Sequence, residues 1–104
     1  MPGVDYERVR STISMSQVLR LIGFTAGRTH GDQLRGPCPV HGSLSARSRA
    51  FSVNLARQRY RCFRCGSSGN QLELWAAVTE QSLHAAAVDL CARLGVEVPW
   101  IRRW

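Results

Sequence analysis

The chain has 104 residues, 44% of them hydrophobic, and a formal net charge of +7, values that fit one small domain or one domain with a tail. No run of about 18 apolar residues occurs, and the N-terminus carries charges where a secretory signal peptide needs an apolar core. We therefore expect a cytoplasmic protein that does not partner with a membrane, and not a secreted disulfide scaffold, because cytoplasmic thiols stay reduced.

The N-terminal part is expected to be helical. Ser14 followed by Gln17 is the pattern of a capping box, and the apolar stripe after it stops at Gly23, which predicts a helix between them. A further helical turn or two is expected over residues 5–10. Residues 27–36 are polar and interrupted by glycine, which indicates a loop or a short edge strand.

The middle of the chain is expected to form two strands before a second helical part. Residues 51–55 alternate between apolar and polar side chains, the period of a half-buried strand. A second strand is expected to follow it, and residues 66–69 are expected to form a flexible turn. Asn70 and Glu73 then begin a helix that extends to about Val78.

A last helix is expected between Ser82, which can cap it, and Gly95, which ends it. Cys91 lies on its apolar stripe without a partner at ligand spacing, so we expect a buried core thiol. The helix completes a domain over residues 1–98, and residues 99–104 form a basic and aromatic tail. That tail either anchors a partner or packs on the core.

Two short clusters supply three thiols and one imidazole. Cys38 and His41 lie three positions apart, as do Cys62 and Cys65, and the stretch between the pairs is long enough for a hairpin that brings them together. This spacing predicts one structural Zn²⁺ ion. The alternatives are two disulfides or four unrelated core residues, and His41 argues against the first because an imidazole has no use in a disulfide.

The net charge is confined to residues 28–64. That segment carries eight arginines against one acid, Asp32, while the rest of the chain has six of each sign. Three thiolates and one Zn²⁺ would leave about +6 on it. A polyanionic partner is the natural inference, although a solvated face without a ligand remains the alternative. All fourteen basic residues are arginine, which favours bidentate phosphate contacts.

The strand that leads into the second cysteine pair indicates how such a partner binds. Arg57, Arg59 and Arg61 fall on one side of it, where like charges repel unless a ligand such as phosphate neutralises them. Tyr60 and Phe63 either stack on unpaired bases or pack against the zinc site. The residues expected to contact nucleic acid are Arg47, Arg49, Arg57, Arg59, Tyr60, Arg61 and Arg64.

Several motifs resemble the N-terminal zinc-binding domain of bacterial replicative (DnaG-type) primases over about residues 18–98. They are GPCPVHG at 36–42, FSVNLARQRYRCFRCG at 51–66, GSSGN at 66–70 and CARLGV at 91–96. The resemblance implies an α+β fold in which a zinc-ribbon antiparallel sheet is flanked by N-terminal and C-terminal helices. It also implies Cys38, His41, Cys62 and Cys65 as zinc ligands, and a sheet face that helps engage single-stranded template DNA.

Two departures from the family pattern limit what the resemblance implies. The segment between His41 and Phe51 is a few residues longer than usual and lacks the proline that commonly precedes the strand. The chain also stops where a primase would continue into its polymerase domain. Its seven acidic residues form no cluster suited to catalytic metals, so primer synthesis by this chain alone is not expected.

The favoured hypothesis is a free-standing, non-catalytic, zinc-dependent module that binds single-stranded DNA. It would work beside a partner protein in replication, or in the transposition or recombination of a mobile element. Two alternatives remain open. The chain is either the N-terminal fragment of a primase, or a protein-interaction adaptor whose arginines meet an acidic protein surface.

Overall fold

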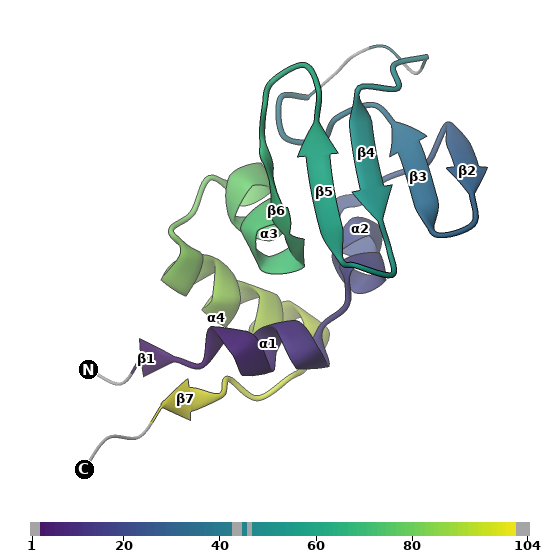
Figure 1. Ribbon diagram of the computed structural model, residues 1–104. Coiled ribbons are helices and arrows are strands. Elements are labelled where there is room, and N and C mark those ends of the chain that lie inside the picture. The colour runs from purple at the N-terminus through teal and green to yellow at the C-terminus, as the bar shows by residue number, and fades with distance from the viewer. Residues whose placement is uncertain (1–2, 43–44, 46, 102–104) are drawn as a thin grey trace.

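An antiparallel sheet with helices on one of its faces forms the body of the protein, as the computed structural model shows (Figure 1). The structure describes residues 3–42, 45 and 47–101. The expected α+β fold is therefore confirmed. In chain order the elements are β1 (Gly3–Val4), α1 (Tyr6–Thr12), α2 (Met15–Ile22), β2 (Arg28–His30), β3 (Gln33–Gly36), β4 (Phe51–Asn54), β5 (Arg59–Cys62), β6 (Ser68–Asn70), α3 (Gln71–Thr79), α4 (Leu83–Leu94) and β7 (Trp100–Ile101).

The helix ends follow the capping signals of the sequence. The Ser14 hydroxyl accepts a hydrogen bond from the Gln17 N–H, and the Gln17 side chain accepts one from the Ser14 N–H at 2.8 Å. The same reciprocal pair joins Asn70 and Glu73 at the start of α3, and Ser82 caps α4. These bonds satisfy N–H groups that have no partner inside a helix, which is why α2, α3 and α4 begin where expected.

The main sheet has the strand order β2-β3-β4-β5-β6, with every neighbouring pair antiparallel. The β2–β3 hairpin lies in the segment predicted as a loop or short edge strand. β6 overlaps the second half of the predicted flexible turn at 66–69, and for residues 68 and 69 that prediction is wrong. Both segments are polar and contain glycine, and their hydrogen bonds come from neighbouring strands, so local sequence carries little signal for them.

β5 is shorter than expected because it begins at Arg59. Residues 55–58 form the turn after β4, and Gln58 adopts a left-handed φ of 53° there. The Gln58 side chain accepts a hydrogen bond from the Met15 N–H at 2.8 Å, at the first turn of α2. The turn therefore ties the sheet to a helix, and Arg57 is not on the strand.

The core lies between one face of the sheet and the helices. Along β4 and β5, buried residues alternate with less buried ones. The fully buried Phe51 ring contacts the rings of Phe24 and Tyr60, with centroids 5.3 and 5.6 Å away. Burying such a side chain contributes about 1.5 to 3 kcal/mol. Cys91 is buried in this core as expected, and burial raises the pKa of its thiol.

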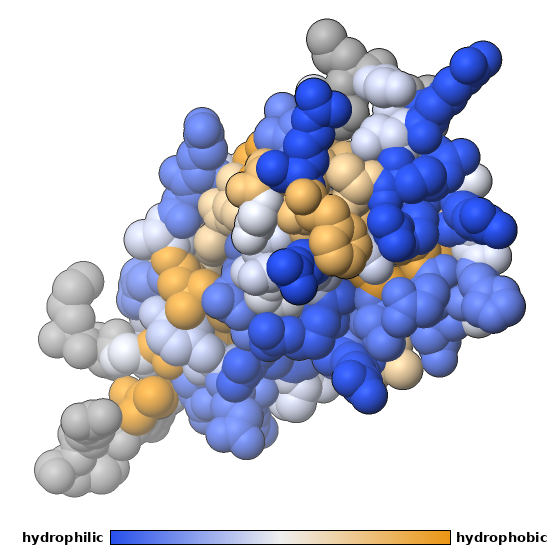
Figure 2. Space-filling model, turned by 45° about the horizontal axis from the view of Figure 1, so that its top comes forward, coloured by the Kyte–Doolittle hydropathy of each residue, from blue (hydrophilic) through white to orange (hydrophobic). Residues whose placement is uncertain are grey.

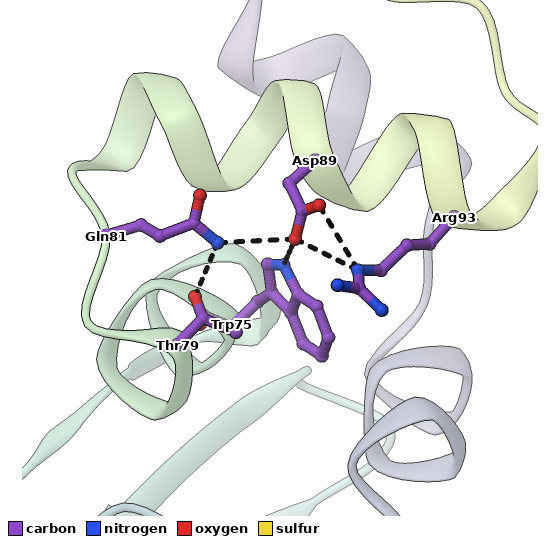
Figure 3. Close-up of polar contacts among 5 residues, drawn as sticks. All are labelled: Trp75, Thr79, Gln81, Asp89 and Arg93. Atoms are coloured by element: carbon purple, nitrogen blue, oxygen red, sulfur yellow. Dashed lines mark hydrogen bonds and ion pairs between the residues drawn. The ribbon is translucent and has the colours of Figure 1, made fainter.

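A carboxylate network joins α3 to α4 (Figure 3). Asp89 accepts hydrogen bonds from the indole N–H of Trp75 at 3.0 Å, from the Gln81 amide at 3.2 Å and from the Arg93 guanidinium. Burial opposes ionisation of Asp89, but these donors outweigh it and hold the pKa of the carboxyl below its ordinary value. The indole of Trp75 is therefore buried between α3 and α4 and uses its N–H group for this network.

The two ends of the described chain meet far from the top of the main sheet (Figure 1). Val4 pairs with Trp100 in a two-stranded ribbon, and the Asp5 N–H donates to the Pro99 carbonyl at 2.8 Å. The first residues of the expected tail thus pair with β1 and Asp5, whereas residues 102–104 lie outside the described residues. The domain boundary after Val98 stays a prediction. In the described part of the chain, no helix has the length and apolar character needed to cross a membrane.

Gln71 is a buried polar residue that holds α1 against α3. Its amide donates to the backbone carbonyls of Arg10 and Ile13, both at 2.9 Å. The Arg10 carbonyl belongs to the last turn of α1, where carbonyls have no partner within the helix. The side chain therefore completes the end of one helix from the first turn of another.

Replacing Gln71 with methionine should destabilise the protein by about 1 to 3 kcal/mol, because it leaves two carbonyl groups without their donor at nearly unchanged side-chain length. Thermal or urea unfolding of the zinc-loaded protein measures the effect. The same replacement at the exposed Gln33 is the control and should change stability by less than about 0.5 kcal/mol. Equal effects at both positions would contradict this role of Gln71.

Candidate metal centre and arginine face

The structure brings the four predicted ligands together at one end of the main sheet. Cys38 and His41 lie in the turn after β3, Cys62 is the last residue of β5, and Cys65 lies in the turn that follows. Their ligand atoms all lie within 4.8 Å of one another. Two strands and two turns thus converge on a single cluster, although the two pairs are far apart in the sequence.

The distances in the cluster fit a tetrahedral metal site. The Cys38 and Cys65 sulfurs are 4.0 Å apart, and the Cys62 sulfur is 3.7 Å from Nδ1 of His41. Zinc–sulfur bonds of about 2.3 Å in a tetrahedron place neighbouring ligands about 3.8 Å apart. A disulfide would need sulfurs at about 2.05 Å, and all four cysteines are free. The disulfide alternative is therefore wrong.

Both ligand turns have the same local design. Gly42 follows His41 and Gly66 follows Cys65, and the two glycines have left-handed φ values of 64° and 80°. Side chains with a Cβ rarely adopt this conformation, so glycine lets the chain reverse directly after the second ligand. In the second turn, the Cys65 N–H also donates to the Cys62 sulfur at 3.4 Å.

Burial divides the cluster into two halves. Cys38 and Cys62 are buried at the edge of the core, whereas His41 and Cys65 are exposed. Burial raises the pKa of Cys38 to about 12, against hydrogen bonds from the backbone of His41 and Val40. For Cys62, burial also opposes ionisation, but hydrogen bonds from the Cys65 and Arg64 backbone and from neighbouring cysteines outweigh it, and its pKa is lowered.

Replacing Cys62 with serine should remove both the metal and cooperative unfolding. Structural zinc contributes about 10 to 16 kcal/mol in small zinc domains at neutral pH, as much as the whole stability of an ordinary domain. Native mass spectrometry and thermal unfolding measure the two effects. Cys91→Ala, in the core away from the cluster, is the matched control and should keep one zinc per chain. A Cys62→Ser protein that unfolds like the control would show that the site is not structural.

Zinc uptake should release protons and should strengthen as the pH rises. The raised pKa of Cys38 keeps this thiol protonated at neutral pH in the metal-free protein, so zinc must displace its proton. We expect about one to three protons per zinc at pH 7. Calorimetric titration in buffers of different ionisation enthalpy measures this number. Zinc binding without proton release, or with an affinity that falls between pH 6 and 8, would contradict the expectation.

The face of the main sheet turned away from the core is mostly polar, and we call it the outer face (Figure 2). Its side chains form two rows of cross-strand partners that run across all five strands. The first row is Arg28, Arg35, Ser52, Arg61 and Ser68. The second row is His30, Gln33, Asn54, Arg59 and Asn70. The sheet therefore gathers charge from β2, β3 and β5 that the sequence distributes over more than thirty residues.

The outer face is slightly hollowed. A depression of about 460 Å³ lies over β4 and β5, and Arg57 lines it from the preceding turn together with residues of both rows. A second depression of about 520 Å³ lies at the β2–β3 edge, and Gln33 lines both. Arg57 thus reaches the same surface as Arg59 and Arg61, although it does not share their strand.

The arginines of the outer face lack acidic partners. In residues 3–42, 45 and 47–101, the one ion pair joins Arg93 to Asp89, on α4. Arg28 and Arg35 are direct cross-strand partners, an arrangement of like charges that destabilises a sheet. The folded protein therefore holds uncompensated positive charge on this face.

The other predicted contact residues are placed differently. Arg47 and Arg64 are both exposed, and Arg64 lies in the turn between Cys62 and Cys65. The guanidinium of Arg49 donates to the carbonyls of Ser48 and Gly27, so this side chain joins two loops. Tyr60 is only 4% exposed, and its hydroxyl pairs with the Ser67 hydroxyl at 2.8 Å. Of the two roles considered for Tyr60, packing is therefore correct, and its ring does not face the solvent.

Sequence reasoning left out two arginines of the first row, Arg28 and Arg35. The two arginines are cross-strand partners in a hairpin, whereas the polar, glycine-containing segment 27–36 predicts only a loop or a short edge strand. Phe63 was considered as a stacking residue and omitted from the predicted contacts. The structure places it on the outer side with 60% of its surface exposed.

Comparisons with known proteins agree with this geometry. A model of the CHC2 zinc finger (DnaG zinc ribbon) family matches residues 3–103. The DNA primase of Treponema pallidum is 32% identical over 82 residues, which cover 75% of this chain and 13% of that protein. The DNA primase of Synechocystis is 30% identical over 82 residues, covering 78% of this chain and 12% of that protein.

A solved structure shows the same fold. It is the crystal structure of the Aquifex aeolicus primase with its zinc binding and RNA polymerase domains, with a TM-score of 0.73 and 24% identity over 91% of this chain and 22% of that chain. The chain spans about an eighth of the length of the curated relatives it matches. The family match and the Cys-His-Cys-Cys cluster together support one structural zinc ion. The chain belongs to the CHC2 zinc-finger family, the zinc ribbon of DnaG-type DNA primases.

Proposed function

We propose that this chain is a zinc-dependent module that binds single-stranded DNA on its outer face, beside a partner protein of replication or of mobile-element transposition or recombination. The observation that carries the proposal is the outer face itself. Its two rows hold arginines, amides and hydroxyls without an acidic partner among the described residues. A polyanion supplies the missing negative charge.

The chemistry of the two rows suits a nucleic acid strand. Arginine binds phosphate through two parallel hydrogen bonds, which a lysine cannot do. The amides of Gln33 and Asn54 are cross-strand partners in the middle of the second row and can donate to and accept from base edges. A strand that crosses the sheet along the rows therefore meets arginines together with amide and hydroxyl groups.

In this proposal the role of the zinc is structural, and its ligands are Cys38, His41, Cys62 and Cys65. Four protein ligands leave no coordination position open for a substrate. The ligands follow β3 and end β5, the strands that carry Arg35 and Arg61. The site thus fixes the spacing of the arginine rows and supplies no chemistry of its own, and we assign no catalysis to these residues. Reduced cysteine ligands fit a cytoplasmic protein.

The comparisons also favour a second reading, in which the chain is the zinc-binding part of a primase whose catalytic part lies elsewhere. The relatives are DNA primases, and the matches cover only 12 to 13% of two of them. Both readings place the same face on DNA. They differ in whether the chain restores primer synthesis when it is added to a primase that lacks its zinc-binding domain.

The test is fluorescence anisotropy with a labelled single strand, a duplex and an RNA strand across a salt series. Three to five phosphate contacts give a slope of log affinity against log salt of about −2 to −3.5 on a single strand. In the Arg59→Ala, Arg61→Ala double variant, the slope should become shallower by about 1.4 and the affinity should fall.

The matched control is the Arg10→Ala, Arg20→Ala double variant, which removes the same charge from the exposed surfaces of α1 and α2. It should keep the slope of the natural protein. No binding to single strands at low salt would overturn the proposal, and an equal loss in both double variants would overturn the assignment to the outer face. Binding to an acidic protein in place of DNA would favour the adaptor reading.

A further inference from the structure

Phe63 is the most exposed of the large apolar side chains in the described residues, at 60%. It lies between the ligand positions Cys62 and Cys65. Its N–H donates to the Ala50 carbonyl at 2.9 Å, which continues the β4–β5 ladder by one residue pair. Because side chains alternate along a strand, the ring lies on the same side as that of Arg61, two residues earlier. The ring therefore belongs to the outer face.

Two guanidinium groups lie over this ring. The Arg61 guanidinium lies 5.1 Å from the ring centroid and the Arg35 guanidinium 5.2 Å from it. Arg35 is also held in place, because it donates to the Arg49 carbonyl at 2.9 and 2.5 Å. Both arginines belong to the first row, on either side of the small Ser52. Figure 2 shows a hydrophobic area on this side of the molecule with hydrophilic side chains around it.

An aromatic ring that contacts two cations and still has 60% of its surface exposed matches a nucleotide. An unpaired base offers a flat surface that stacks on the ring, and its neighbouring phosphates lie within reach of the two guanidinium groups. An apolar protein surface would cover the ring but would remove both cations from water without supplying negative charge. The second ligand turn keeps the ring in place, since Phe63 lies between Cys62 and Cys65 of the cluster.

We propose that Phe63 is the stacking platform for one unpaired nucleobase, and that Arg35 and Arg61 bind the phosphates beside that base. This inference rests on the proposed function and specifies how the outer face recognises its ligand. The platform selects single strands over duplex DNA, because a paired base is already stacked and does not present its face to the ring. Tyr60 cannot stack on a base in this way, because its ring is buried in the core.

The test compares Phe63→Ala with the natural protein on two labelled probes. One is a single-stranded oligonucleotide and the other is an abasic strand of the same length, which keeps the phosphates and lacks the bases. Loss of one stacked base should weaken binding of the normal strand by about 5- to 100-fold with an unchanged salt slope. Binding of the abasic strand should be unchanged. Phe63→Leu, which keeps an apolar side chain without an aromatic face, should behave like Phe63→Ala.

Leu83→Ala is the control, because Leu83 is another exposed apolar residue, at the start of α4. It should leave both affinities unchanged. Zinc content and thermal unfolding verify that each variant is folded. If Phe63→Ala does not fold, the affinities of Phe63→Leu for the two probes test the stacking platform. Natural protein that binds neither probe overturns the proposed function together with this inference. Normal salt-dependent binding that neither Phe63 variant weakens, or an equal loss on both probes, overturns the stacking platform alone.

Discussion

The rest of the structure depends on one constraint, the coordination of a single metal ion by two pairs of residues that lie about twenty positions apart. A chain of this length buries only about 65% of its unfolded surface, so its apolar core provides little stability to spare. Cys38 and Cys62 are themselves buried at the edge of that core. The metal therefore extends the core at the end of the sheet where turns, and not helices, close the structure.

The same constraint determines what the two faces of the sheet present. The ligands terminate β5 and follow β3, so they hold the strands on both sides of β4. With the register held, the inner residues Phe51, Val53 and Tyr60 meet the helices while their neighbours form the two polar rows. Gathering arginines on one face costs electrostatic energy, which the metal and the core together offset.

Much of this protein was predictable from the sequence because the responsible interactions are local. The capping boxes at Ser14 and Asn70 operate over three residues, and both form as expected. The ligand pairs are equally local, since each lies within four residues. The confinement of the net charge to residues 28–64 follows directly from the positions of the charged residues in the sequence. The ligand spacing predicted one structural zinc, and the resemblance to primase zinc-binding domains implied the α+β fold class, although neither gave the full set of residues on the outer face.

Only the tertiary structure decided which side chains share that face. Arg57 leaves the strand because Gln58 turns to accept a hydrogen bond from the first turn of α2. Arg28 and Arg35 join the rows because β2 and β3 obtain their hydrogen bonds from the sheet, and their own sequence gives weak strand propensity. Tyr60 is buried and Phe63 is exposed for the same reason. Which of two nearby aromatic rings is buried depends on where a strand begins and which side the helices cover, and both are settled by contacts between residues distant in the sequence.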